Sequence, residues 1–373
     1  MTKRVLVTGA ANIGKAGVAT IVYKWGQEFD SNVVIYDYLM QSGLPEEQYQ
    51  NAIRNKGGIM FTCDHKKSMM GTIKWVTDTI RDNKYETIHI NSDSAYIAAA
   101  YIYAAKRAGI RDIFVHSHCT QIDDTNNVRR TIKVLLHKIC KPYVCSNTKM
   151  FLACSRVAGE WMFGKQNTES EKYKTIYNGV DVENYLFDKE ERDSIRSELG
   201  LKDKFVLANV GRLSYQKNQD YLIKTFATYH RKNPDSMLVI VGDGELKSQL
   251  HNQVKALVLE DSVIFTGLRG DVPSILSAVD VLVMPSRFEG LPVTMVEAQM
   301  ADLPCVVADT ITREAKFTKN VVYVNGWNEE EWVDAIELTR RVERIQKAEE
   351  KRNSVFNIKI AALELQTILE RSF

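Results

Sequence analysis

Short apolar runs alternate with helical stretches along most of the chain, in two separate series. The strand candidates of the first series are residues 4–7, 32–36, 87–91, 113–115 and 150–154. Those of the second series are residues 205–210, 237–241, 262–265, 279–284 and 304–308. Strands that alternate with helices favour parallel sheets covered by helices on both faces. The sequence therefore predicts an α/β protein with two doubly wound, Rossmann-like domains.

A length of 373 residues suits two domains better than one. We expect a first domain over residues 1–185 and a second over residues 200–350, joined by the charge-rich linker 181–204. A helix over residues 357–373 has an apolar stripe (Ile360, Leu363, Leu365, Ile368, Leu369) and is expected to pack back on the first domain. Two such domains would face a central cleft, where ligands bind at the carboxyl ends of the strands.

Composition excludes several classes of protein. The net charge of +2 gives no basic footprint for a nucleic acid. The six cysteines form no C-x-x-C pair, which indicates reduced residues, as in a cytoplasmic protein. The N-terminus starts directly with a strand, and no apolar run is long enough to span a membrane. We therefore expect a soluble, cytoplasmic protein.

Two glutamates, Glu289 and Glu297, are separated by seven residues after the apolar run 279–284. Pro292 suits the first position of a helix, which places Glu289 in a loop and Glu297 in the second helical turn. Backbone amides over residues 290–293 would suit an anionic or polyhydroxyl ligand. This segment is the first candidate for a binding site.

Two cations, Arg212 and Lys217, follow the apolar strand 205–210 directly. Cations at the mouth of a strand–helix unit suit a diphosphate, although solvated loop residues would give the same pattern. The turn that begins at Gly242 follows the next strand. Gly242 would either let the backbone approach a ligand closely or simply permit a tight connection.

In the first domain, a glycine-containing turn over residues 8–17 ends at Gly17, before a helix. Such a turn can cradle phosphate, but Asn12 breaks the dinucleotide-binding pattern G-x-G-x-x-G. His116 and His118 end the strand 113–115 and would point to the same face. They are either satisfied structural residues or neutral groups that face a sugar hydroxyl. No third ligand is evident beside them, so a zinc site is not expected.

The pattern of residues 129–141 predicts a basic amphipathic helix. Ile132, Leu135, Leu136 and Ile139 share one of its faces. That face would either pack on the core or contact an anionic membrane or a lipid-linked acceptor.

Taken together, these motifs resemble retaining GT-B glycosyltransferases of the large bacterial capsule and exopolysaccharide type (glycosyltransferase family 4, "glycosyl transferases group 1"). The resemblance rests on V-G-R-L-x-x-x-K-N at residues 210–218, the E-x7-E pair, His-Ser-His at 116–118 and Y-N-G-V-D at 177–181. There are two mild departures. Ala16-Gly17 stands where the family has a glycine pair, and Asp302 replaces a glycine after E-A-Q-x-A.

The resemblance implies transfer of a hexose, with retention, from a nucleotide-sugar to a hydroxyl of a glycan or lipid-linked acceptor. We expect the donor to be UDP-linked and the product to be exopolysaccharide, capsule or another cell-surface glycan. The family's account assigns leaving-group stabilisation to Arg212 and Lys217, the donor sugar to Glu289 and His118, and the ribose to Glu297. Further donor-binding residues would be Gly17, Gly242, Gly290, Leu291, Pro292 and Val293.

No cofactor is expected. The D-x-D motif that clamps a metal–diphosphate is absent, so Arg212 and Lys217 would take the place of a metal ion. The same architecture also admits a nucleotide-sugar epimerase, a phosphorylase, for which we find no pyridoxal lysine, or a non-catalytic nucleotide-sugar-binding protein.

Overall fold

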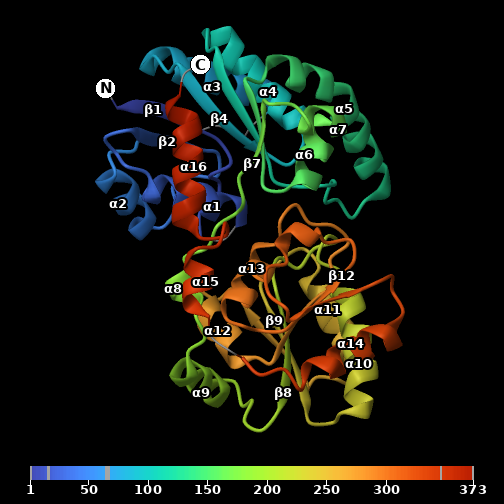
Figure 1. The fold of residues 1–373 in the computed structure, drawn as a ribbon. Helices are drawn as coiled ribbons and strands as arrows, with labels where there is room; N and C mark the ends of the chain where they lie inside the picture. Colours follow the sequence, from blue (N-terminus) through green and yellow to red (C-terminus); the bar gives the residue numbers. More distant parts are fainter. Residues whose placement is uncertain (1, 15–16, 64–67, 345–346, 372–373) are drawn as a thin grey trace. The chain divides into compact units, whose positions relative to one another are not determined.

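The structure is a computed structural model that describes residues 2–14, 17–63, 68–344 and 347–371 (Figure 1). Its contacts divide the chain into two compact units. The first unit contains residues 1–122, 126–179 and 355–373, and the second contains residues 123–125 and 180–354. Each unit has one parallel sheet with helices on its faces, which confirms the predicted α/β class of two Rossmann-like folds.

The sheet of the first unit has the strand order β3-β2-β1-β4-β5-β6-β7. Its strands are β1 (Lys3–Val7), β2 (Val34–Met40), β3 (Met60–Thr62), β4 (Thr87–Ser92), β5 (Asp112–Ser117), β6 (Met150–Ala153) and β7 (Tyr173–Thr175). Its helices are α1 (Gly17–Glu28), α2 (Glu47–Asn55), α3 (Met69–Asn83), α4 (Ala95–Ala108), α5 (Asn127–Asn147), α6 (Arg156–Phe163), α7 (Lys165–Thr168) and α16 (Ile358–Glu370). The strand order reverses between β1 and β4, which is where doubly wound sheets open a crevice for ligands.

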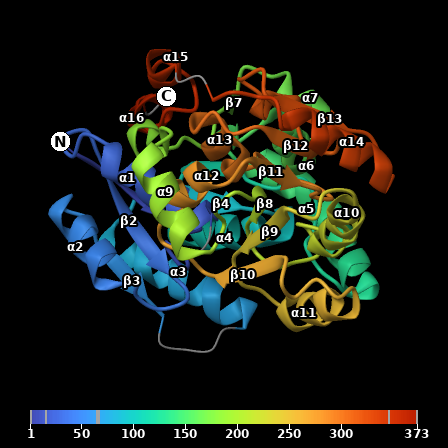
Figure 2. The same cartoon turned by 90° about the horizontal axis from the view of Figure 1, so that it is seen from below.

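The sheet of the second unit has the order β10-β9-β8-β11-β12-β13. Its strands are β8 (Phe205–Val210), β9 (Ser236–Val241), β10 (Val263–Gly267), β11 (Val281–Met284), β12 (Cys305–Ala308) and β13 (Val321–Val324). Its helices are α8 (Val182–Tyr185), α9 (Lys189–Glu198), α10 (Gln219–Lys232), α11 (Lys247–Ala256), α12 (Val272–Ala278), α13 (Val293–Met300), α14 (Glu329–Thr339) and α15 (Ala348–Arg352). A short 3-10 turn, η1, covers Arg313–Ala315. Figure 2 shows α10, α11 and α14 on one face of the sheet and α9, α12 and α13 on the other.

Both sheets are built from apolar strands because each strand is covered on two faces. All four residues of β11 and all four of β12 are buried. The helices add the largest buried side chains, among them Trp25 of α1 and Trp332 of α14. These cores hold the carboxyl ends of the strands in fixed positions.

The expected linker over residues 181–204 is wrong, because most of it forms α8 and α9. Arg192 and Arg196 of α9 donate to the two carboxylate oxygens of Asp280, at 2.6 and 3.3 Å. The two arginines of this segment are thus paired with Asp280, and the segment packs as part of the second unit. Helix α8, which we had assigned to the end of the first domain, also lies in the second unit.

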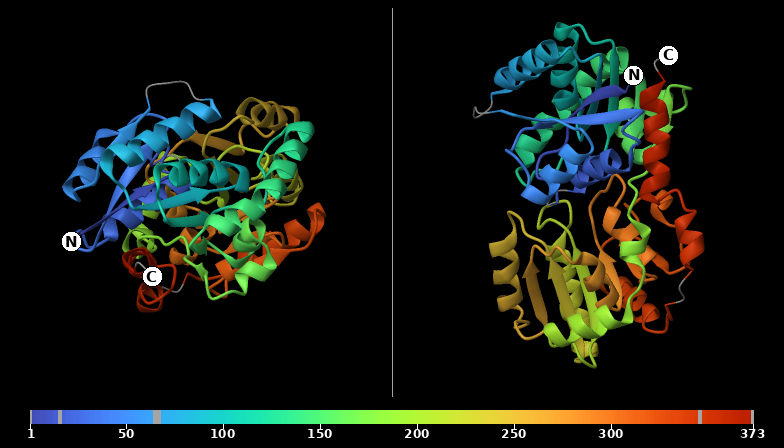
Figure 3. Two further views of the ribbon diagram at one scale, coloured as in Figure 1. Left: turned by 90° about the horizontal axis from the view of Figure 1, so that it is seen from above. Right: turned by 90° about the vertical axis from the view of Figure 1, so that its left-hand side faces the viewer.

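The C-terminal helix α16 belongs to the first unit, where it packs on α1 and β2 (Figure 1, Figure 3). Gln366 accepts a hydrogen bond from the backbone amide of Asp30 at 2.7 Å. The predicted apolar stripe is only partly correct, because Ile360 and Leu363 are exposed. Small residues such as Ala361 take their place on the buried face, which lets the helix lie close to the unit.

Candidate functional site

The neighbouring strands β8 and β11 define the candidate site of the second unit. Their pairing places Leu207 opposite Val281, so both strands end at the same edge of the sheet. The loops that follow are therefore adjacent, and the amide of Arg287 donates to the carbonyl of Gln216 at 2.8 Å. Two segments that are distant in the sequence thus form one continuous surface between β8 and β11, where the strand order of this sheet reverses.

A buried ion pair joins these two loops. Lys217 Nζ lies 2.7 Å from Glu289 Oε1, and the side chains are only 16% and 6% exposed. Gln216 Nε2 donates to Glu289 Oε2 at 3.0 Å and to the Phe288 carbonyl at 3.0 Å. Both oxygens of Glu289 are thus engaged, which fixes the carboxylate and the ammonium group at the mouth of the sheet. We predicted both charged residues for the site, but neither their direct pairing nor the contribution of Gln216.

Arg212, the other predicted cation, lies at the surface of the same loop. Its side chain is 68% exposed and lies 3.0 Å from Glu245. An exposed pair of this kind contributes little to stability, so a more strongly charged ligand can replace Glu245 as its partner. The structure does not bring Arg212 into the buried pair of Lys217 and Glu289.

Gly242 has a structural explanation. It lies beside Gly211, and a Cβ atom at Gly242 would be 2.0 Å from the Gly211 carbonyl oxygen. Its φ of +138° also disfavours other residues. The two turns continue the pairing of β8 and β9, with Leu213 N donating to Asp243 O at 3.0 Å. Of the two interpretations given above, the tight connection explains the glycine at this position. Contact of Gly242 with a donor stays a prediction.

Glu297 lies in the second turn of α13, as predicted, and Pro292 occupies the N-cap, one residue earlier than expected. The Pro292 carbonyl accepts from Met295 N at 3.0 Å. Gly290 and Leu291 precede it and are buried, whereas Val293 is half-buried. The helix start thus lies directly between Glu289 and Glu297 in the chain.

Tyr185 of α8 is a residue that the sequence analysis missed. Its hydroxyl donates to Glu297 Oε1 at 2.6 Å. Burial, and then the adjacent Glu297 carboxylate, raise the pKa of Tyr185, so the hydroxyl remains a donor. The two residues are 112 positions apart, and no local pattern links them.

In the first unit, His116 and His118 stack on each other with ring centroids 4.5 Å apart, which confirms that they share a face. Trp25 also stacks on His116, at 5.0 Å, and lies 6.1 Å from His118. His89, which we did not anticipate, completes the cluster at 5.5 Å from His116. The chain therefore buries three imidazoles together beside the end of β5.

The hydrogen bonds of Asn91 define the tautomer of His118. Asn91 Nδ2 donates to the Thr8 carbonyl at 3.1 Å, which leaves Asn91 Oδ1 to accept from His118 Nε2 at 2.9 Å. In a neutral imidazole the other nitrogen, Nδ1, is then an acceptor. Burial lowers the pKa of His118 to about 3, so the neutral form that we expected is the stable one at pH 7. Neutral His118 therefore keeps Nδ1 as a buried acceptor that has no hydrogen-bond partner among the described residues.

Gly17 is the first residue of α1 and is exposed. Apart from its chain neighbours and the backbone of its own helix, no heavy atom of the described residues lies within 4 Å of the position that its Cβ would occupy. Packing therefore does not require a glycine here, and a ligand-binding role stays a prediction. Ala16 of the predicted Ala-Gly pair falls outside the described residues.

Helix α5 exposes the apolar face that the sequence predicted. Ile132, Leu135, Leu136 and Ile139 are 53%, 57%, 42% and 63% exposed. The interpretation of this face as core is therefore wrong. His137 is buried; its Nδ1 accepts from the Ala95 amide at 3.0 Å and its Nε2 donates to the Trp161 carbonyl at 3.0 Å. The buried side of the helix includes His137 and Val144, and Cys140 and Cys145 pack against the core, whereas the four apolar residues named above face outward.

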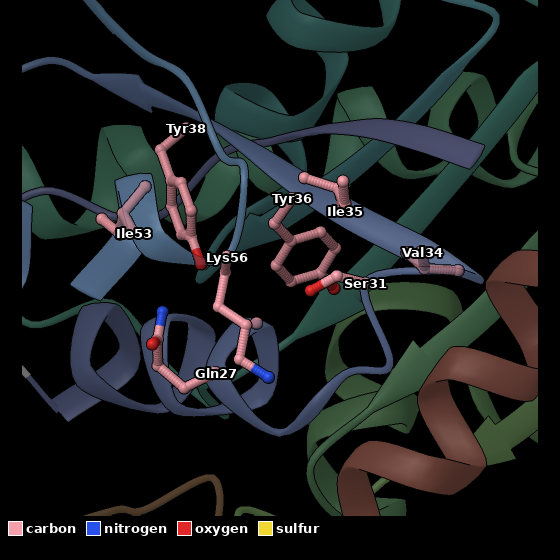
Figure 4. Close-up of a pocket in the computed structure, with 9 residues that line it drawn as sticks. Gln27, Ser31, Val34, Ile35, Tyr36, Tyr38, Ile53 and Lys56 are labelled. Atoms are coloured by element: carbon pink, nitrogen blue, oxygen red, sulfur yellow. The ribbon is translucent and has the colours of Figure 1, made fainter. Parts of the chain in front are cut away.

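The remaining features are simpler. A small hollow beside Tyr36, Tyr38 and Lys56 has a volume of about 10 Å³, enough for one water but not for a sugar (Figure 4). Within the described residues, no group of three or more His, Cys, Asp or Glu side chains could hold a metal ion. None of the helices in the described part of the chain is long and apolar enough to cross a membrane.

Two family models match the chain. The first, "Glycosyl transferases group 1", matches residues 191–358, and the second, "Glycosyltransferase Family 4", matches residues 16–184. EpsF of Bacillus subtilis (strain 168), a glycosyltransferase by its name, is 28% identical over 84% of this chain and 80% of its own length. The Escherichia coli UDP-Gal:alpha-D-GlcNAc-diphosphoundecaprenol alpha-1,3-galactosyltransferase is 33% identical over 62% of this chain and 59% of its own length.

Solved structures agree in fold. Anabaena HepE in complex with UDP-glucose matches with a TM-score of 0.73 and 20% identity, over 98% of this chain and 94% of that chain. Sucrose-phosphate synthase of Thermosynechococcus elongatus matches with a TM-score of 0.76 and 14% identity, over 98% of both chains.

The histidine cluster predicts how stability depends on pH. Burial lowers the pKa of His89 and of His118 to about 3, and that of His116 well below its ordinary value of 6.5. The unfolded chain therefore binds protons that the folded chain lacks, so stability is fully present above pH 6.5 and is lost as the pH falls towards 3. Each histidine should lower the free energy of unfolding by about 1.4 kcal/mol per pH unit within this window.

Urea unfolding of the full chain between pH 7 and pH 5 would measure this slope. His116→Phe, which cannot be protonated, should remove about one third of the three-histidine contribution. A slope that is unchanged in this variant would contradict a buried, neutral His116.

Proposed function

Because the chain belongs to the family 4 GT-B glycosyltransferases, we propose that it transfers a hexose from a UDP-sugar to a hydroxyl of a glycan acceptor, with retention and without a metal ion. The buried pair of Lys217 and Glu289, next to the start of α13, is the observation that supports this proposal most directly. Two of the proteins named above support a UDP-sugar as the donor. The Escherichia coli galactosyltransferase is named for UDP-Gal, and Anabaena HepE was solved in complex with UDP-glucose. They also favour a transferase over an epimerase or a non-catalytic binding protein.

In the proposed mechanism, Lys217 and Arg212 stabilise the negative charge that grows on the departing diphosphate. Lys217 has three donors and can keep Glu289 as a partner while it donates to a phosphate oxygen. Arg212 is at the surface and can leave Glu245 for the diphosphate. Two cations of this kind would act where a metal ion acts in other transferases, so no metal is required.

Glu297 would bind the ribose hydroxyls, and Tyr185 would hold its carboxylate in place. Glu289 and neutral His118 would bind hydroxyls of the donor sugar, and Gly17, Gly242 and residues 290–293 would complete the donor site. With Lys217 on one oxygen and Gln216 on the other, Glu289 is oriented before the donor arrives. Such preorganisation lowers the cost of forming the transition state.

The setting that we propose is the synthesis of exopolysaccharide, capsule or another cell-surface glycan in the cytoplasm, at the inner face of the membrane. The Erwinia amylovora amylovoran biosynthesis glycosyltransferase AmsD is a relative whose name supports a role in glycan synthesis. The exposed face of α5 supports contact with lipid. Its apolar residues lie beside Arg129 and Lys133, and this combination is typical of helices that lie in a membrane interface.

The donor assignment can be tested with UDP-, GDP-, ADP- and CMP-hexoses in buffer with EDTA. We expect the UDP-sugars to raise the melting temperature and to turn over, because binding to the folded state stabilises it by mass action. Activity that EDTA abolishes and manganese restores would contradict the metal-free mechanism. Stabilisation by another nucleotide alone would contradict the UDP assignment.

Substitutions within the site should separate binding from chemistry. Lys217→Ala and Arg212→Ala should each lower kcat by about a hundredfold, as expected for the loss of roughly 3 kcal/mol of charge stabilisation. Glu289→Ala should also lower mainly kcat, whereas Glu297→Ala should mainly weaken UDP binding, because a ribose contact is equal in the ground and transition states. Lys232→Ala, which removes an exposed ion pair of the same unit, is the matched control. A normal kcat in both cation variants would exclude their role.

Membrane contact predicts salt-sensitive binding to phosphatidylglycerol vesicles. Each cation near such a surface contributes about 1 kcal/mol, so the change of Arg129, Arg130 and Lys133 to Glu should abolish binding. The double variant Leu135→Ser with Ile139→Ser should weaken the component of vesicle binding that persists at high salt, because it removes apolar side chains that would be buried in the membrane. The same charge reversal on other elements, at Arg54, Lys84 and Lys172, should have little effect. Wild-type protein that ignores these vesicles at low salt would exclude this surface as a membrane contact.

A further inference from the structure

A cavity of the second unit lies at the sheet edge opposite to the candidate donor site. Its volume is about 510 Å³, within the range of small-molecule sites. Phe205, which lines it, is the first residue of β8, and Asp280 directly precedes β11. The donor loops follow the other ends of the same two strands. The two sites are therefore separated by the length of the sheet, as the positions of α9 and α13 show (Figure 1).

Cations dominate the lining of this cavity. Arg192, Lys204, Arg340 and Arg344 contribute four positive charges, against two carboxylates, Asp203 and Asp280. Asp280 is already engaged, since its oxygens accept from Arg192, from Arg196 and from the Val206 amide. The cations that line the cavity outnumber its carboxylates by two, and three of them each have a carboxylate partner: Arg192 pairs with Asp280, Lys204 with Asp235 and Arg340 with Glu337.

Arg344 is held by an aromatic ring and by backbone carbonyls. Arg344 lies over Phe187, with its Cζ 4.9 Å from the ring centroid, and its Nη1 donates to the carbonyls of Leu276 and Ser277 at 3.1 Å. Burial, and then the nearby charge of Arg192, lower the pKa of Arg344 to about 10. An anion in the cavity would relieve this repulsion between cations.

Arg340 has N–H groups that are available to a ligand. Its Nη1 donates to Asn233 Oδ1 at 2.9 Å, and its Cζ lies 4.6 Å from the centroid of Phe205. Its Nε and Nη2 have no acceptor among the residues that the structure describes. Lys204 donates to Asp235, whose side chain is 83% exposed, so this partner can be exchanged for a ligand.

We propose that this cavity binds a phosphorylated small molecule of about the size of a monosaccharide phosphate, independently of the donor site. The planar fork of an immobilised guanidinium matches two phosphate oxygens, and charged hydrogen bonds of this kind are among the strongest in proteins. The aromatic rings of Phe187 and Phe205 provide an apolar floor beside the cations. The proposal does not depend on which sugar the enzyme transfers.

The test is isothermal titration of the full chain with glucose 6-phosphate at constant ionic strength, with glucose as the uncharged control. Wild-type protein should bind glucose 6-phosphate and not glucose. Arg340→Gln should weaken binding by about tenfold or more, and Arg340→Lys, which keeps the charge but loses the fork, should bind at an intermediate level. Lys204→Gln is a second variant at an exposed position, in case Arg340→Gln unfolds, and it should also weaken binding.

Two controls separate this site from the donor site. Lys217→Ala should leave glucose 6-phosphate binding unchanged, as should Lys232→Gln, which removes a cation outside the cavity. Binding that is lost in Lys217→Ala would place the ligand at the donor site and overturn the proposal. The proposal is also overturned if wild-type protein does not bind glucose 6-phosphate, or if the Arg340 and Lys204 variants bind it as the wild type does.

Discussion

The pairing of β8 with β11 is the constraint on which the functional surface of the second unit depends. These strands are neighbours in the sheet although β9 and β10 lie between them in the sequence. Their shared edge brings Lys217 within 2.7 Å of Glu289, 72 positions further along the chain. The cation and the carboxylate are therefore positioned by the hydrogen bonds of the sheet. Any shift in this register would separate them, which is why the apolar character of the two strands is as important to the site as its charges.

Both units bury polar groups near the carboxyl ends of their strands, but they do so in different ways. The second unit buries opposite charges that neutralise each other, and the first unit buries imidazoles that stay neutral. Lys217 is a donor beside an acceptor, whereas His118 keeps one acceptor nitrogen because Asn91 occupies the other position. A diphosphate requires positive charge, whereas a sugar hydroxyl can donate to a carboxylate or to a neutral imidazole nitrogen.

The fold and the principal charged residues could be predicted from the sequence because they depend on local patterns. Apolar runs mark the strands, and Arg212, Lys217, Glu289 and Glu297 lie directly after strands or at a helix start. What failed depends on contacts between distant segments. The charges of residues 181–204 indicated a linker because their partner, Asp280, lies far along the chain. Tyr185 gave no signal of its contact with Glu297 for the same reason. The periodicity of α5 showed which residues share a face, but periodicity alone does not tell whether that face is covered.

The order of the chain through the two units has a consequence for synthesis. The second unit is formed almost entirely by the continuous stretch 180–354, whereas the first also needs residues 355–373. During translation the second unit is therefore made in full before α16 emerges from the ribosome. Until then α1 and β2 lack the helix that covers them, and the face that includes the partners of Leu365 and Leu369 is open to water. The nascent first unit thus passes through a long interval in which a chaperone can bind it, although its own strands were made first.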